Sequence, residues 1–402
     1  MVTHRGVLSI VLLLMPICIL LDGLIIPLVT GFLLFMFVWP QKHSLSPIVL
    51  RQIDREALLI VALLLVWPFI SSFWALSQEA ALSTVARVSC FVLLGLLGLT
   101  LIRKTTPNDD TKPLECFAIG IILAAFSVAL ETLPGGGLLM AGAKLLQMTP
   151  TDYYDKSVNK GICELTLLAW VGVIAFKLSK HDKLALWMPW LVMPSILYLH
   201  SLTAKTGALA AIAVFTFMRL WPQLGKKLVA WGLPLLFATW PIIIESMKPI
   251  LTNRLIYREL PTSSQHRIGI WNFVMERWYE KPLLGWGADS SRIMPGGNDA
   301  FQPYMANLPL HPHNIPLQVL LEHGLVGFML YCTAMFLFVR RVVRYMQFDP
   351  VINAAIGAMM AAYITMCLSG FSMWQSWWVI TPILLCLLTT FFLSEHPSAK
   401  KS

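Results

Sequence analysis

Two histidines and an asparagine stand where the longest polar stretch of the chain returns to hydrophobic sequence. The residues are His311-Pro312-His313-Asn314. Because imidazole titrates near neutral pH, two histidines and an asparagine beside a basic loop are suited to general acid–base chemistry and substrate binding. Pro312 restricts its neighbours to an extended or turn conformation. A structural histidine that makes a hydrogen bond at the membrane boundary is the alternative interpretation.

A metal site is a weak interpretation of the same residues. A His-x-His pair needs further ligands, and no cysteine or acidic residue stands at a typical spacing from it. The seven cysteines all lie in hydrophobic segments, and none forms a CxxC pair. We therefore expect small core cysteines without a disulfide framework, and no metal or other cofactor.

Several cations are placed where they could bind an anion. Arg267 leads the apolar stripe of a predicted helix, and an arginine on a buried side needs an anionic partner. Lys205 lies in a turn between two hydrophobic segments that is too short to be a flexible solvated loop. Lys160 and Arg87 precede other hydrophobic segments, where ionisable residues are functional candidates. Arg254 lies near the start of the long polar stretch.

Most of these cations also have a structural interpretation. Arg267 could be snorkelling or salt-bridged, Arg87 could snorkel, and Lys160 could pair with Glu164 four residues later. The functional interpretation is that they surround one multiply charged anion. Arginine forks match phosphate geometry and lysine supplies a point charge, so a lipid-linked pyrophosphate fits this set.

The segment that carries Arg267 has the pattern of an amphipathic helix over residues 267–281. Trp271, Val274 and Trp278 fall on one stripe and polar residues fall on the other. Such a helix would lie against the bundle or the membrane interface, with its tryptophans at headgroup level. The glycine-rich sequence with Gly285 and Gly287 then predicts a tight turn.

A second helix is predicted directly after the histidines. Residues 315–322 have a helical pattern that leads into a hydrophobic segment, and Gly324 and Gly327 are expected to allow close helix packing.

The composition identifies an integral membrane protein. The 402 residues are 57% hydrophobic and only 13% charged, whereas soluble domains carry roughly 25% charged residues. Apolar stretches of about 20 residues, the length that a helix needs to cross a bilayer, recur along the chain. The start of the chain resembles a signal peptide only superficially, because no cleavage site is evident and a second span follows at once. We expect a retained first helix.

Twelve spans are predicted. Their approximate ranges are 7–21, 24–40, 57–76, 85–102, 115–133, 158–177, 184–203, 205–220, 227–245, 324–340, 351–370 and 376–394. The expected organisation is a single all-α membrane domain, with nine spans in residues 1–245, a large loop at 246–312 and three spans in residues 313–402. No internal repeat is evident.

Basic residues predict the orientation. Alternate connections carry Arg5; Lys42, Arg51 and Arg55; Arg103, Lys104 and Lys112; Lys177, Lys180 and Lys183; Arg219, Lys226 and Lys227; Arg340, Arg341 and Arg344; and Lys400 with Lys401. The positive-inside rule makes these connections and both termini cytoplasmic. The loop at 246–312 is then periplasmic in a bacterial inner membrane. The net charge of +9 follows from this topology and needs no nucleic-acid partner.

At this point the motifs resemble the O-antigen ligase/polymerase superfamily. The residues that carry the resemblance are Lys205-Thr206-Gly207, Arg267-x-x-x-Trp271, Pro282-x-x-Gly285-x-Gly287 and His313-Asn314-x9-Gly324-x-x-Gly327. The last spacing is the one associated with O-antigen ligases. The resemblance covers roughly residues 158–345 and the layout of twelve spans with one late large loop, whereas the first 150 residues contribute only hydrophobicity.

The resemblance implies an inverting, metal-independent glycosyltransferase with a GT-C-like membrane fold. Such an enzyme moves a glycan from undecaprenyl pyrophosphate to a lipid A–core acceptor. By motif, Arg267 would bind the pyrophosphate and Lys205 would stand where the family often has arginine, with the charge kept and the bidentate geometry lost. His313 would be the catalytic base, with His311 as the alternative for that role.

Two other functions are compatible with parts of the pattern. An O-antigen polymerase uses the same donor but extends one lipid-linked chain with another. A twelve-span transporter or flippase is a different class, but it would commonly show related halves and broken helices at mid-membrane. The polar residues here concentrate on one face, which favours a transferase.

Overall fold

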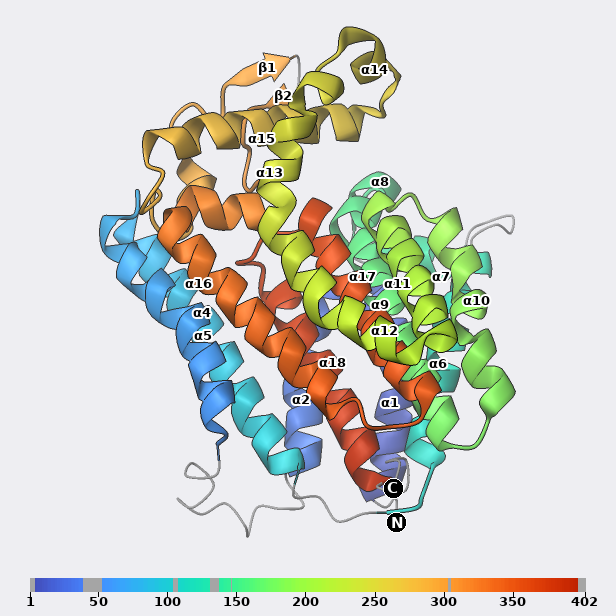
Figure 1. Ribbon diagram of the computed structural model, residues 1–402. Coiled ribbons are helices and arrows are strands. Elements are labelled where there is room, and N and C mark those ends of the chain that lie inside the picture. The colour runs from blue at the N-terminus through green and yellow to red at the C-terminus, as the bar shows by residue number, and fades with distance from the viewer. Residues whose placement is uncertain are drawn as a thin grey trace.

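The structure is a computed structural model that describes residues 4–38, 53–103, 108–130, 137–145, 147–302 and 305–396. It is a bundle of long helices with one large loop folded over an end (Figure 1). The long helices are α1 (His4–Leu21), α2 (Ile26–Val38), α4 (Arg55–Ser71), α5 (Gln78–Ile102), α6 (Lys112–Leu130), α9 (Asn159–Leu178), α10 (Asp182–Tyr198), α11 (Leu202–Leu220), α13 (Leu233–Leu251), α16 (Ile315–Tyr345), α17 (Pro350–Ser369) and α18 (Ser376–Glu395).

Shorter elements connect them. They are η1 (Gly23–Ile25), η3 (Ser72–Trp74), α7 (Leu138–Leu145), α8 (Pro150–Tyr153), η4 (Tyr154–Val158), α12 (Pro222–Lys227), η5 (Leu228–Gly232), α14 (Arg254–Glu259), α15 (Thr262–Glu280), η6 (Ser290–Ile293), β1 (Ala300–Gln302) and β2 (Met305–Ala306). The two short strands pair antiparallel within the large loop.

The prediction of an all-α polytopic membrane protein is confirmed. Each of the twelve predicted ranges overlaps one of these long helices, and ten segments of the described chain are long and apolar enough to cross a membrane. The apolar helix over Gly23–Phe37 is shorter than these, and α10 has 17 residues. Basic residues Lys42, Arg51, Lys104, Lys400 and Lys401 lie outside the described residues.

Two helices form the centre of the bundle. In both α9 and α17, 89% of the most apolar window is buried. Both are apolar around most of their circumference, as a helix enclosed by others must be. Small residues permit the close packing of neighbours, since a side chain at Gly207 of α11 would meet Met366 of α17. The outer helix α4, by contrast, buries only 22% of its window and presents apolar residues outward.

The large loop and the chain ends lie at opposite ends of the bundle. Helix α15 runs across one end, here called the loop end, whereas α1 begins and α18 ends at the other (Figure 1). Charged residues pair at that second end. Arg5 contacts Glu395 at 2.5 Å, and Arg341 contacts Asp54 at 2.7 Å.

Several predicted boundaries were wrong, among them that of α13, which was predicted at 227–245 and spans Leu233–Leu251. Helix α5 begins at Gln78, seven residues before the predicted start at 85, because the hydroxyl of Ser77 accepts a hydrogen bond from the N–H of Ala80 and caps the helix. Arg87 therefore lies inside a span and not before it. Helix α15 begins at Thr262, and its buried residues include Ile270, Phe273 and Val274, with Trp271 and Trp278 half-buried.

Candidate active site

The long helix α16 is interrupted at Gly324, close to the loop end. This glycine has φ 63° and ψ −169°, so the helical hydrogen bonds stop and resume around it. A second segment, residues 282–287, satisfies the freed backbone groups. The N–H groups of Leu325 and Val326 donate to the carbonyls of Pro282 (2.8 Å) and Leu283 (3.1 Å).

The carbonyls on the other side of the break are satisfied in the same way. The N–H groups of Trp286 and Gly287 donate to the carbonyls of Leu321 (2.9 Å) and Glu322 (2.7 Å), and the Trp67 indole donates to the carbonyl of His323 (3.2 Å). Buried backbone groups need such partners. The glycine-rich turn and the break in α16 therefore form one interlocked unit.

The four motif glycines have different reasons to be glycine. Gly285 and Gly324 both have positive φ, and a side chain on either would collide with backbone of the other segment. At Gly287 a side chain would collide with the backbone of Ala75, and at Gly327 with the Trp67 indole. The prediction that Gly324 serves helix packing was therefore wrong. Gly324 breaks the helix and lets residues 282–287 approach its backbone, whereas Gly327 lets α16 approach the Trp67 indole of α4.

The histidine segment leads directly into α16. The Asn314 side chain accepts a hydrogen bond from the N–H of Leu317 at 3.1 Å and caps the helix. Asn314 is fully buried, and this cap gives it a structural role at the start of α16. His313 has φ 53°, a left-handed conformation that is uncommon outside glycine and is often found at functional sites.

The hydrogen bonds of His313 define its tautomer. Its Nδ1 lies 2.9 Å from the carbonyl oxygen of Gly370, which can only accept, so Nδ1 carries the proton. The lone pair of the neutral ring is then on Nε2. His313 is half-buried, and Nε2 is the nitrogen available to accept a proton.

His311 has the opposite tautomer. Its Nδ1 accepts a hydrogen bond from the backbone N–H of His313 at 3.2 Å, so the proton of the neutral ring is on Nε2. The two ring centroids are 4.2 Å apart. The pair therefore offers one acceptor nitrogen, on His313, and one donor, on His311.

Both imidazoles are held neutral at pH 7. Burial, followed by the positive charge of Arg267, lowers the pKa of His313 from 6.5 to about 4. Burial also lowers the pKa of His311 well below its usual value, with contributions from His313, Arg292 and Arg267. A neutral His313 is ready to accept a proton over the whole physiological range.

Helix α15 brings Arg267 to these histidines. The indole N–H of Trp271, one turn after Arg267, donates to the carbonyl of Pro312 at 3.0 Å. Arg267 is half-buried, and no hydrogen bond or ion pair joins it to another residue in the described part of the chain. Burial lowers its pKa, and no carboxylate opposes that effect. An arginine in this state can bind an anion.

Lys205 belongs to the same end of the bundle. It lies in the first turn of α11, where Ser201 caps the helix and lies 3.6 Å from Cys163. A methyl group added to Gly370 would lie 2.9 Å from Thr203 of the same turn. Since the carbonyl of Gly370 holds His313, the structure brings the turn that carries Lys205 next to the histidine segment.

The other predicted cations are not joined to the histidines by any contact between described residues. Arg254 is exposed at the start of α14. Lys160 lies against Gly23, within reach of the charge of Asp22. Its predicted partner Glu164 instead accepts a hydrogen bond from Thr381. Arg87 donates to the carbonyl of Trp374 at 3.3 Å, which gives it a structural role.

Sequence reasoning missed a buried polar cluster beneath the histidines. Its central residue, Glu322, is fully buried and accepts hydrogen bonds from Asp289, Gln318 and Trp374. The sequence signal is that an acidic residue and an amide stand four residues apart in the predominantly apolar first turns of a helix. No group of three or more His, Cys, Asp or Glu side chains in the described ranges is arranged to hold a metal ion.

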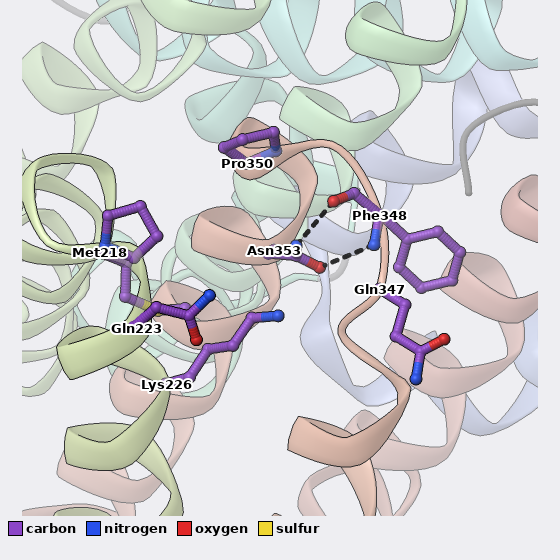
Figure 2. Close-up of a pocket in the computed structure, with 8 residues that line it drawn as sticks. Met218, Gln223, Lys226, Gln347, Phe348, Pro350 and Asn353 are labelled. Atoms are coloured by element: carbon purple, nitrogen blue, oxygen red, sulfur yellow. Dashed lines mark hydrogen bonds between the residues drawn. The ribbon is translucent and has the colours of Figure 1, made fainter. Parts of the chain in front are cut away.

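A cavity of about 320 Å³ lies elsewhere, at the end opposite the histidines. Figure 2 shows its lining residues, among them Lys226, Gln347 and Asn353, between α12 and the connection from α16 to α17. The Lys226 amine donates to the carbonyl of Met346, and Asn353 bonds to the backbone of Phe348. These polar groups serve the local structure, so we place the candidate site at the loop end.

A comparison with protein families finds a match that covers the candidate site. Residues 190–332 match a family model described as O-Antigen ligase, and this range contains Lys205, Arg267, both histidines and the interlocked glycines. Residues 190–332 therefore resemble the O-antigen ligase family. The resemblance inferred from the motifs is thereby confirmed.

Individual proteins similar to this chain are found in Rickettsia. One from Rickettsia conorii, named "Putative polysaccharide ligase", is 25% identical over 351 residues, which is 86% of this chain and 82% of the relative. A protein of the same description from Rickettsia felis is 26% identical over 327 residues, 80% and 77% of the two chains. A third, from Rickettsia bellii, is 28% identical over 236 residues, 58% and 57%.

Proposed function

We propose that this protein is an O-antigen ligase. It transfers a polysaccharide from undecaprenyl pyrophosphate to a sugar hydroxyl of lipid A–core, as an inverting, metal-independent glycosyltransferase. The family match and the names of the Rickettsia relatives support a ligase-type role in polysaccharide assembly. The observation that carries the proposal is the half-buried Arg267, which has no carboxylate partner among the described residues and lies beside two neutral histidines.

Arg267 suits a phosphate-containing donor. The cost of placing a guanidinium in a partly buried site is offset when it forms charge-assisted hydrogen bonds to an anion. Lys205, in the first turn of α11, adds a second positive charge. Together they would stabilise the negative charge that develops on the leaving pyrophosphate, which is the demand of this reaction when no metal is used.

His313 is the proposed base. In the reaction, Nε2 removes the proton from the acceptor hydroxyl as the oxygen attacks the anomeric carbon of the donor. The bond from that carbon to the pyrophosphate oxygen breaks, and undecaprenyl pyrophosphate leaves from the opposite face, which inverts the configuration. The tautomers favour His313 over His311, because the neutral His311 has its acceptor nitrogen occupied by the N–H of His313.

The proposed location is the bacterial inner membrane with the site facing the periplasm. The positive-inside rule places the connections rich in lysine and arginine in the cytoplasm. The large loop and the described ends of the chain lie at opposite ends of the bundle (Figure 1). This arrangement supports cytoplasmic termini and a periplasmic Arg267 and His313.

The deciding experiment offers purified protein a lipid-linked O-antigen donor with two acceptors in separate reactions. One acceptor is lipid A–core and the other is a second lipid-linked glycan. Transfer to lipid A–core alone supports the ligase. Transfer only to the lipid-linked glycan would identify a polymerase, and no transfer to either, in protein that is folded and monodisperse, would refute both.

A gene deletion gives the complementary result. Loss of a ligase should leave polymerised glycan on undecaprenyl pyrophosphate and bare lipid A–core on a lipopolysaccharide gel. Loss of a polymerase should leave core that carries a single repeat. A lipopolysaccharide pattern identical to the parent strain would contradict either transferase.

A further inference from the structure

The segment that holds His313 is itself fixed by a buried pair on α16. Gln318 and Glu322 are one helical turn apart and both are fully buried. The Gln318 amide N–H donates to Glu322 Oε1 at 3.0 Å. No hydrogen bond among the described residues joins either of them to His311 or His313, and the proposed function assigns them no role.

Glu322 accepts from two further donors on separate segments. Its Oε2 accepts from the backbone N–H of Asp289 at 2.9 Å and from the Trp374 indole at 2.6 Å. The carboxylate thus joins α16, the loop before η6 and the connection between α17 and α18. These three N–H donors use both carboxylate oxygens as acceptors, and the Ser291 side chain is a further hydrogen-bond partner of Glu322.

Gln318 binds the same connection through both ends of its amide. Its nitrogen lies 3.0 Å from Ser372 Oγ, to which the second N–H donates, and 3.4 Å from Ser291 Oγ, and its oxygen accepts from the N–H of Met373 at 3.2 Å. Ser372, Met373 and Trp374 follow Gly370 by two to four residues. Gly370 supplies the carbonyl to which His313 donates.

We infer that Gln318 and Glu322 are positioning residues for the proposed transfer. They hold the 370–374 connection in place, so the Gly370 carbonyl keeps the proton of His313 on Nδ1 and leaves Nε2 as the accepting nitrogen. This inference rests on the proposed function. A displaced Gly370 carbonyl would release the His313 ring, and the proton could then shift from Nδ1 to Nε2. The ring would lose both its orientation and its accepting nitrogen at the reaction site.

The hydrogen-bond pattern makes a sharp test possible. In E322Q the side chain has one oxygen. The N–H groups of Asp289 and Trp374 need that oxygen as their acceptor, so the introduced amide N–H groups point at the N–H groups of Gln318. Two donors then oppose each other in a buried site. In Q318E two carboxylates face each other, which is also unfavourable.

The double variant Q318E/E322Q restores a complete pattern. The introduced amide at position 322 would accept from the N–H groups of Asp289 and Trp374 and donate to the introduced carboxylate at position 318. That carboxylate would accept from the N–H of Met373 and from the hydroxyls of Ser291 and Ser372, which can rotate to donate. The exchange keeps the charge and nearly the volume of the native pair.

The experiment measures kcat and KM for transfer to lipid A–core with purified, monodisperse protein. We expect E322Q and Q318E each to lower kcat by about tenfold to a hundredfold, as small misplacements of a catalytic group do. KM for the lipid-linked donor should change less than about twofold, because the cations are untouched. The exchange variant should recover most of the lost kcat. E276Q, at an exposed position of α15, is the matched control and should behave as wild type.

The outcomes separate the two proposals. Failure of the wild-type protein to transfer glycan refutes the proposed function. An active wild type together with normal kcat in E322Q, or with an exchange variant no better than E322Q, refutes the positioning role alone. Where a single variant yields no folded protein, the exchange variant decides. Recovered kcat supports the pairing, and inactive or unfolded protein overturns it.

Discussion

Trp271 donates its indole N–H to the carbonyl of Pro312 at 3.0 Å. This bond joins α15, which carries Arg267, to the short segment that carries both histidines. Proline contributes no N–H of its own, so its carbonyl is the only backbone hydrogen-bonding group available at this residue. The spacing of Arg267 and Trp271, one helical turn, therefore links the position of the proposed anion-binding group to that of the proposed base.

The first prediction concerns this bond. Trp271→Phe keeps most of the aromatic packing and removes the donor, which should lower the free energy of unfolding by about 1 kcal/mol. Transfer should fall by more than the loss of folded protein, because the histidine segment is no longer tied to α15. Thermal unfolding in detergent and the transfer rate of the folded fraction measure the two effects. Trp187→Phe, at a side chain that is 61% exposed, is the control and should change neither.

The second prediction concerns the charge of Arg267. Arg267→Ala should lower kcat/KM by about a hundredfold to a thousandfold, as loss of a group that stabilises transition-state charge does. Arg267→Lys should retain part of the activity, because it keeps the charge without the fork. Arg277→Ala is the control on the same helix, where the arginine pairs with Glu280 at 2.8 Å and should matter little. Equal activity of the Arg267 and Arg277 variants would refute anion binding at Arg267.

The third prediction distinguishes the two histidines. His313→Ala should lower kcat by about a hundredfold or more, the usual contribution of a general base. His311→Ala should have a smaller effect, because its ring supports the backbone of His313 and its accepting nitrogen is already used. Initial rates of transfer by equal amounts of folded protein measure both. Near-normal transfer by His313→Ala would rule out His313 as the base.

The sequence predicted the parts of this site that are local. The helical pattern predicted α15 and the glycine-rich turn after it. The helix predicted directly after the histidines is the start of α16. The Glu322 cluster was out of reach, because its donors come from Asp289 and Trp374, which are distant in sequence. Gly324 was misinterpreted for a related reason. A Gly-x-x-Gly spacing is equally consistent with close packing and with a positive φ, and only the contact with residues 282–287 distinguishes them.

The tautomers could not be predicted either. The sequence contains two histidines around a proline, and nothing local distinguishes their nitrogens. The partner of His313 is the carbonyl of Gly370, 57 residues later, and the partner of His311 is the backbone of His313 itself. The chemical difference between the two rings is therefore a property of the fold.

The fourth prediction concerns pH. The pKa of His313 is about 4 in the folded protein, whereas 6.5 is the ordinary value for histidine and applies to the unfolded chain. The folded state therefore binds fewer protons than the unfolded state between these two values. Above pH 6.5 the lowered pKa of His313 costs no stability. As the pH falls from 6.5 towards 4, the unfolded state takes up the proton first, so the free energy of unfolding decreases. The dependence of kcat/KM for the donor on pH reports the ionisation of the free enzyme. Its neutral plateau should extend below pH 6, and kcat/KM should fall near pH 4.

The same measurement tests the cause of the shift. Arg267→Gln removes a positive charge that lowers the pKa of His313, so the acid limb of its residual activity should move to higher pH. A wild-type limb centred near pH 6.5 would contradict a buried neutral His313. A limb that does not move in Arg267→Gln would contradict the coupling between the two residues.

The last prediction concerns the break in α16. Gly324→Ala places a methyl group about 2.2 Å from the carbonyl oxygen of Leu283 and forces an L-residue into φ 63°. The conformation, with ψ −169°, is one that essentially only glycine adopts and alone costs about 1–3 kcal/mol, and the collision must displace residues 282–287. We expect a loss of more than about 2 kcal/mol of stability, together with loss of transfer. Gly31→Ala is the matched control, because nothing lies within 4 Å of the added methyl and alanine favours the α2 helix. Thermal unfolding in detergent measures both variants, and equal stability would show that residues 282–287 do not lock the break.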